Sequence, residues 1–172
     1  MKKRIFSLSI LIFLLFPLPT NANELLQMYF DSLPNNVKTY VLRSNVSINM
    51  VDSIDYHVPN GEVNAITYFY PSNAIIDIKN GHEEYLIHEI GHSIDYYNNN
   101  LWFWSGTDNF KYIYLAERYN NTLFFYGNGI DNEHEYFAEA FNQYLYNPIK
   151  LKKYNPLTYD YIKNVVNILQ WL

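Results

Sequence analysis

The stretch that decides the fold is His88-Glu89-Ile90-Gly91-His92, which matches the pattern His-Glu-x-x-His. Apolar residues recur every four positions through and around it, a period that predicts a helix over residues 83–97. Two residues four positions apart lie one above the other on a helix, so both imidazoles can reach the same metal ion. A glycine inside a helix costs about 1 kcal/mol relative to alanine. We expect Gly91 to leave room for another element to pack closely beneath the site.

The chemistry that suits this pattern is metal-assisted hydrolysis. Glu89 follows the first histidine and is rotated away from the ligand face, so it can take a proton from a water molecule without binding the metal itself. Zinc makes such a water a stronger acid. The alternative is an exposed helix that carries two histidines by chance, because a pattern with three fixed letters is common.

A third protein ligand is needed, because catalytic zinc keeps three protein ligands and leaves one position for water. The chain contains no cysteine, so this ligand must be a histidine or a carboxylate. One common extension of the pattern requires Gly at position 95 and His at position 98, where this chain has Asp95 and Asn98. The candidates are therefore more distant in the sequence: Glu117, Glu133, His134, Glu135 and Glu139.

Glu135 and Glu139 lie four positions apart on one face of a helix predicted over residues 131–146. One of them can bind the metal, while the other, a turn deeper, accepts a hydrogen bond from a ligand histidine. Glu135 has an alternative interpretation as a capping residue three positions after Asn132. His134 is the second choice for the third ligand.

Residues 1–22 are predicted to be a signal peptide. Three basic residues precede an apolar run over residues 5–16, and small residues precede the expected cut. The run is too short to cross a bilayer of about 30 Å, which argues against a membrane anchor. We therefore expect a secreted chain without stable membrane insertion after cleavage, and a single domain over residues 23–172.

Charge and cysteine content narrow the class of protein. The net charge is −5, and loss of the three N-terminal basic residues makes it −5 − 3 = −8. An acidic chain repels phosphate backbones, which argues against nucleic acid as a partner. With no cysteine, an exported chain needs another source of stability, which a core rich in tyrosine and phenylalanine can supply and to which a bound metal can add. We expect a monomer whose partner is a peptide or protein substrate.

The remaining patterns predict an α+β fold, with a small sheet before the motif helix and helices after it. Strands are predicted over residues 46–51, 65–70 and 74–78, the last two as a hairpin. Further helices are predicted over residues 24–30, 34–42, 108–117, 131–146 and 156–172, with Thr107 or Asp108 as the cap of the third. An aromatic loop is predicted over residues 101–106.

With these motifs the chain resembles the catalytic domain of anthrax lethal factor and the related Pro-Pro endopeptidases. The matching pieces are His88-Glu89-Ile90-Gly91-His92-Ser93-Ile94-Asp95 and Glu135-Tyr136-Phe137-Ala138-Glu139-Ala140-Phe141, and the resemblance runs from about residue 66 to the C-terminus. It implies a zincin-like metalloprotease domain with one Zn²⁺ per chain, held by His88, His92 and Glu135. Glu89 is then the general base.

The resemblance also implies roles for residues outside these ligands. Tyr126, followed by glycine, best matches a tyrosine whose hydroxyl stabilises the oxyanion of the tetrahedral intermediate. Glu139 would accept a hydrogen bond from a ligand histidine, and Asp95 either orients a ligand or lies at the helix surface. The strand over residues 74–78 would border the substrate cleft. The aromatic residues 101–104 either face the substrate or fold back on the core.

The resulting hypothesis is a secreted zinc-dependent endopeptidase. The first alternative is a catalytically inactive zinc-binding module of the same fold, or an adhesion or toxin-associated module. The second is a zinc hydrolase that acts on a bond other than a peptide bond. Glu89 favours an active enzyme, because an inactive relative has no need of a general base.

Overall fold

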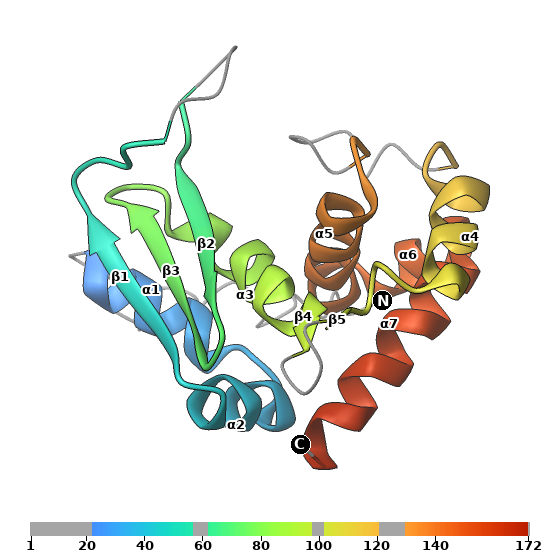
Figure 1. Cartoon of the computed structure of the whole chain (residues 1–172), viewed down its shortest axis with the longest axis horizontal. Helices are drawn as coiled ribbons and strands as arrows, with labels where there is room; N and C mark the ends of the chain where they lie inside the picture. The colour runs from blue at the N-terminus through green and yellow to red at the C-terminus, as the bar shows by residue number, and fades with distance from the viewer. Residues whose placement is uncertain (1–21, 57–61, 98–101, 121–129, 172) are drawn as a thin grey trace, which may run out of the picture.

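The structure, a computed structural model, describes residues 22–56, 62–97, 102–120 and 130–171. It shows a small three-stranded sheet at one side of the molecule and a group of helices at the other (Figure 1). The motif helix α3 and the later helix α5 lie between them and contact each other. The structure thus confirms the α+β fold that the sequence predicts.

The elements follow one another along the chain as the sequence patterns predict, with exceptions given below. The helices are α1 (Ala22–Asp31), α2 (Asn35–Arg43), α3 (Leu86–Asp95), α4 (Asp108–Glu117), α5 (Glu133–Tyr146), α6 (Pro148–Tyr154) and α7 (Pro156–Ile168). The strands are β1 (Val46–Val51), β2 (Ala65–Tyr70), β3 (Asn73–Lys79), β4 (Tyr96–Tyr97) and β5 (Trp102–Phe103). The 3-10 helices η2 (Glu83–Tyr85) and η4 (Leu169–Trp171) precede α3 and follow α7.

The sheet has the strand order β1-β3-β2. β2 and β3 form the predicted antiparallel hairpin, and β1 adds to the other side of β3 in parallel. The expectation that the strand over residues 74–78 borders the cleft is therefore wrong, because both of its edges are paired. β2 is the edge strand on that side of the described sheet, and it packs against α3.

The predicted helix over residues 83–97 is too long at both ends. It begins with the 3-10 turn η2, and α3 ends at Asp95. The next two residues pair with Phe103 and Trp102 in the short hairpin β4–β5, so part of the predicted aromatic loop is a strand. Tyrosine, phenylalanine and tryptophan favour strands, and here pairing with a later segment overrides the helical pattern.

Helix α6 was not predicted. Its first residue is Pro148, which lies two residues after the end of α5. A proline lacks the backbone N–H that the interior of a helix requires, but it fits the first helical position well. The proline after Asn147 therefore ends α5 and also begins α6.

Helices α3 and α5 cross in direct contact at Gly91. A Cβ atom at this position would lie 2.9 Å from the Cα atom of Ala138 and 3.0 Å from its carbonyl oxygen. Around the crossing, α3 buries Ile87, Ile90 and Ile94, and each such side chain contributes about 1.5–3 kcal/mol. The expectation that this glycine makes room for another element is confirmed, and that element is α5.

In the part of the chain that the structure describes, no helix combines the length and apolar content needed to cross a membrane. The predicted signal peptide lies outside the described residues except for Ala22, where α1 begins.

Candidate metal centre and catalytic cleft

Helix α3 presents His88 and His92 one turn apart on the face toward α5. Their ring centroids are 4.8 Å apart, with the ring planes nearly perpendicular. Glu135, in the first turn of α5, reaches both rings. Its Oε2 atom lies 3.3 Å from Nε2 of His88, and its Oε1 atom lies 3.4 Å from Nε2 of His92. One ligand atom from each of the three residues lies within 4.8 Å of the other two.

These three residues fit a zinc ion. Two ligand atoms that each lie about 2.1 Å from a tetrahedral ion are about 3.4 Å apart. Here a different oxygen of Glu135 faces each ring, at 3.3 Å and 3.4 Å, and one ligand atom from each residue lies within 4.8 Å of the other two, which is close to that spacing. Two imidazoles and one carboxylate are also a donor set that zinc accepts at hydrolytic sites, with a fourth position left for water. The geometry therefore allows His88, His92 and Glu135 to hold one Zn²⁺.

The electrostatics of the group also favour a cation. Burial lowers the pKa of His88, but the carboxylates of Glu135 and Glu139 outweigh it and raise the pKa to about 10. Burial raises the pKa of Glu135, whereas hydrogen bonds with His88 and His92 outweigh it and hold that pKa well below its usual range. Both shifts have the same cause, because the carboxylates favour positive charge on the rings and the rings favour negative charge on Glu135; a divalent cation would supply positive charge at the same place.

Glu139 lies one turn beyond Glu135 on the same face of α5. Its Oε2 atom is 3.5 Å from Nδ1 of His88, while Nε2 of the same ring faces Glu135. Gln143, a further turn along, donates a hydrogen bond of 2.6 Å to the other oxygen of Glu139. Spacing of four residues on one helix thus places the predicted metal ligand and the predicted partner of His88 together.

Glu89 belongs to α3, and its side chain is buried against β2. Its Oε2 atom accepts a hydrogen bond of 2.6 Å from the hydroxyl of Thr67, in the middle of β2. Thr67 was not among the residues singled out from the sequence. Its strand was recognised, but no local pattern shows which residue of a strand will meet a helix some twenty positions later.

Asp95 has a different partner from the one expected. It is buried and accepts two hydrogen bonds from Ser105, of 2.7 Å from the backbone N–H and 2.6 Å from the hydroxyl. Its Oδ2 atom also lies 3.1 Å from Nδ1 of His134. The alternatives considered for Asp95, a metal-ligand partner or a surface residue, are both replaced by this buried network.

His134 is held by that network outside the group of three. A hydrogen bond with Asp95 raises the pKa of His134, against a smaller opposing effect of burial. Its ring packs edge-on against Phe103 with the centroids 4.5 Å apart, and it lines the cleft. The structure thus brings Glu135, and not His134, to His88 and His92.

The remaining candidates for a third ligand lie elsewhere. Glu117 is buried and accepts hydrogen bonds from Leu157 and Thr158 at the start of α7. Glu133 begins α5 and does not belong to the group of three. The capping alternative for Glu135 also fails, because Asn132 caps the helix while the carboxylate of Glu135 reaches the two histidines. Tyr126 lies outside the described residues.

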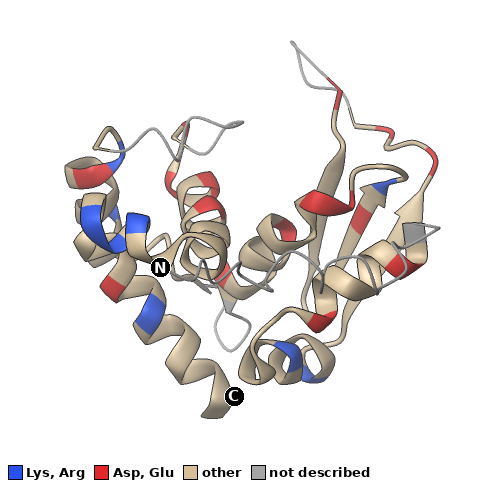
Figure 2. Cartoon of the chain, turned by 180° about the vertical axis from the view of Figure 1, so that it is seen from behind, with Lys and Arg blue, Asp and Glu red and all other residues tan. Residues whose placement is uncertain are grey.

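The group opens into a cleft of about 1080 Å³ between β2, α3 and α5. The described residues that line it include five glutamates and no lysine or arginine. Acidic positions on α3 and α5 are visible from behind in Figure 2. The elements β2, α3 and α5 contain no lysine or arginine. Phe69 and Phe103 form an aromatic wall with ring centroids 5.9 Å apart. Part of the predicted aromatic segment 101–104 therefore faces the cleft.

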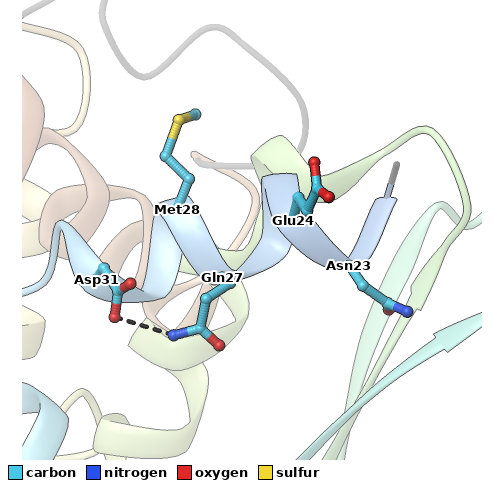
Figure 3. Close-up of a pocket in the computed structure, with 5 residues that line it drawn as sticks. All are labelled: Asn23, Glu24, Gln27, Met28 and Asp31. Atoms are coloured by element: carbon cyan, nitrogen blue, oxygen red, sulfur yellow. Dashed lines mark hydrogen bonds between the residues drawn. The ribbon is translucent and has the colours of Figure 1, made fainter. Parts of the chain in front are cut away.

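A smaller hollow of about 490 Å³ lies along α1 (Figure 3). Its lining is Asn23, Glu24, Gln27, Met28 and Asp31, and Gln27 donates a hydrogen bond of 2.9 Å to Asp31. Its lining contains no histidine, whereas the larger cleft is lined by His88, His92 and Glu135.

The fold is a zincin-like α+β fold, in which a motif helix and a second helix bring together two histidines and a glutamate that could hold a metal ion. The family described as "Anthrax toxin lethal factor, N- and C-terminal domain" matches residues 52–165. This match spans 165 − 52 + 1 = 114 of the 172 residues, and the chain belongs to this family. The resemblance found in the sequence is thereby confirmed.

A solved structure of similar fold is that of the Pro-Pro endopeptidase from Paenibacillus alvei. It matches with a TM-score of 0.61 and 20% sequence identity, over 84% of this chain and 90% of that one. No curated protein sequence matches the chain.

Proposed function

We propose that this chain is a secreted zinc-dependent endopeptidase. The observation that carries the proposal is the convergence of His88, His92 and Glu135 on a cleft beside the buried carboxylate of Glu89. Membership of the lethal factor family supports it, as does the fold shared with an endopeptidase of Paenibacillus alvei.

In this proposal His88, His92 and Glu135 hold one Zn²⁺. When bound, the ion supplies a Lewis acid that polarises the peptide carbonyl and makes water more acidic. Glu139 accepts a hydrogen bond from Nδ1 of His88, which fixes the ring so that Nε2 points toward Glu135. The chain itself thus orients the ring of His88 before substrate arrives.

The proton transfers fall to Glu89. Its carboxylate takes one proton from the attacking water as the new carbon–oxygen bond forms. It gives that proton to the leaving nitrogen as the carbon–nitrogen bond breaks, so that one water is consumed, an acid and an amine are released, and the carboxylate is regenerated. Tyr126 donates a hydrogen bond to the carbonyl oxygen as negative charge develops there.

The substrate is proposed to be an extended peptide that lies along β2. The outer edge of this strand is unpaired within the described sheet, and an extended segment can add to such an edge through backbone hydrogen bonds. Ala65, Ile66 and Thr67 of β2 line the cleft. Such a peptide would pass next to Glu89, because Thr67 contacts that residue.

The decisive experiment compares the purified wild-type chain with two variants, on a peptide library and by metal analysis. Wild type is expected to carry one zinc per chain and to cleave some peptide. E89A should keep its zinc and lose cleavage by a factor of about 10² to 10⁴, because the proton acceptor is gone. E135A should lose zinc. Full activity in E89A would contradict the mechanism.

Glu133 offers a matched control, since it lies in the same first turn of α5 but outside the group of three. E133A should keep both zinc and activity. If E133A and E135A lost zinc equally, damage to the start of α5 would explain the result and Glu135 would lose its assigned role.

Secretion is tested separately. A chain expressed with residues 1–22 in a bacterial host should be found outside the cytoplasm with Asn23 as its first residue, as N-terminal sequencing would show. Full-length protein retained in the cytoplasm would refute this part of the proposal without touching the enzymatic part.

A further inference from the structure

The carboxylate of Glu89 has one side-chain donor among the described residues, the hydroxyl of Thr67. Glu89 is only 5% exposed, and the distance from Oγ1 of Thr67 to its Oε2 atom is 2.6 Å. The same hydroxyl lies 3.2 Å from the backbone carbonyl of Glu89. A hydroxyl carries one hydrogen, and 2.6 Å is the length of a charge-assisted bond to a carboxylate. The hydrogen therefore belongs to the bond with Oε2.

The position of this hydroxyl is set by the sheet and not by α3. Thr67 pairs with Ile76 of the central strand, so its backbone is fixed by the ladder between β2 and β3. Its branched side chain has few favourable rotamers. The bond therefore ties Glu89 to the strand beside the cleft, along which the peptide is proposed to lie.

This attachment has a consequence for proton transfer. A glutamate has several rotamers, and a bond to Oε2 selects among them and leaves Oε1 free as the proton acceptor. A misplacement of about 1 Å can cost about a hundredfold in rate. We propose that Thr67 is a positioning residue, which holds the general base Glu89 in its productive orientation. The inference rests on the proposed function of Glu89.

The test compares two substitutions at Thr67 in the full chain. T67V keeps the shape of the side chain and removes the hydroxyl, whereas T67S keeps the hydroxyl and removes the methyl group. In T67V we expect kcat to fall about 10- to 100-fold, with KM changed less than about threefold because ground-state binding does not use this hydroxyl. T67S should recover kcat to within about threefold of wild type. Zinc content should be equal in all three proteins.

Thr158 provides a matched control. It is buried, its hydroxyl donates a bond of 2.8 Å to the carboxylate of Glu117, and neither residue lines the cleft. T158V removes this bond to a carboxylate, together with a contact of 2.8 Å to the hydroxyl of Tyr136, outside the cleft. It should lower the melting temperature and leave kcat unchanged, which separates loss of stability from loss of positioning.

Two results would overturn the inference while the proposed function stands. One is that the kcat of T67V equals that of wild type while E89A is inactive. The other is an equal loss in T67V and T67S, which would assign the effect to packing of the strand. Should T67V fail to fold, T67A gives the same comparison without a branched apolar side chain at this half-buried position. An inactive wild type, or an active E89A, would instead refute the proposed function.

A second measurement does not depend on activity. In crystal structures of the metal-free wild type and of T67V, Glu89 should occupy one rotamer in contact with Thr67 in the first and several rotamers in the second. A single unchanged rotamer of Glu89 in T67V would contradict a positioning role for Thr67, whatever the peptide assay shows.

Discussion

Glu139 contacts the proposed metal ligand His88 but does not belong to the group of three ligands. Its two oxygens have different partners, Nδ1 of His88 at 3.5 Å and the amide of Gln143 at 2.6 Å. With Nδ1 committed to this carboxylate, the lone pair of Nε2 is free to bind a metal. Glu139 is thus placed to choose the tautomer of His88 without touching the ion.

The first prediction concerns this carboxylate. E139A should weaken zinc binding by about 10- to 100-fold, because the ring of His88 loses the partner that orients it. Competition with a chromogenic chelator measures the change in the dissociation constant. E133A, in the same helix, should bind zinc as wild type does, and an unchanged affinity in E139A would remove the assigned role.

At the scale of the elements, the distance between α3 and α5 decides whether the site exists. His88 and His92 come from one helix and Glu135 from the other, so their separations of 3.3 Å and 3.4 Å depend on how closely the helices cross. The crossing is set at Gly91, which faces the backbone of Ala138.

The second prediction follows from this contact. In an isolated helix Gly→Ala stabilises by about 1 kcal/mol, but here the new methyl group would clash with backbone, and overpacking of this kind costs about 1–3 kcal/mol. G91A should therefore unfold at a lower denaturant concentration and bind zinc more weakly. The double variant G91A/A138G should not recover, because the clash is with main-chain atoms at position 138. Recovery in the double variant would show that the side chain of Ala138 is responsible.

A third prediction separates structural from metal-binding carboxylates. Glu117 accepts hydrogen bonds from two backbone N–H groups and a hydroxyl at the start of α7, with Thr158 supplying two of the three donors. E117A leaves these donors unsatisfied and should lower the free energy of unfolding by about 1–3 kcal/mol. Zinc content and kcat of the folded variant should equal those of wild type. Loss of zinc at unchanged stability would instead indicate that Glu117 binds the metal.

At the scale of the whole molecule, the proposed ion lies where the sheet and the helical part meet. Helix α3 packs on β2 and on α5, and the ligands come from α3 and α5 (Figure 1). The chain contains no cysteine, so no disulfide joins these parts. A bound metal is therefore expected to contribute to the stability of the whole protein.

The fourth prediction is that removal of zinc destabilises the entire fold. A ligand present at about 1,000 times its dissociation constant contributes about 4 kcal/mol, which corresponds to a fall in melting temperature on the order of 10 °C for a chain of this size. Scanning calorimetry with and without a chelator measures it. Zinc, but not magnesium, should restore both the melting temperature and the activity. An unchanged melting temperature after complete removal of the metal would contradict the coupling.

The sequence by itself determined what depends on neighbours along the chain. The four-residue spacing of His88 and His92, and of Glu135 and Glu139, places each pair on one helix face, and Asn132 caps the second helix. Turn residues and alternation located the first three strands. These properties follow from backbone geometry and local hydrogen bonds, which a short window of sequence contains.

Only the tertiary structure decided which distant segments meet. It placed β2 and not β3 at the edge of the sheet and paired β4 with β5. It also placed the carboxylate of Asp95 in contact with Ser105 and His134. It also brought Thr67 to Glu89. These contacts join residues from five to thirty-nine positions apart, and their free energy depends on the packing of whole elements. No local periodicity encodes that packing, because a strand or helix of the same pattern can meet several partners.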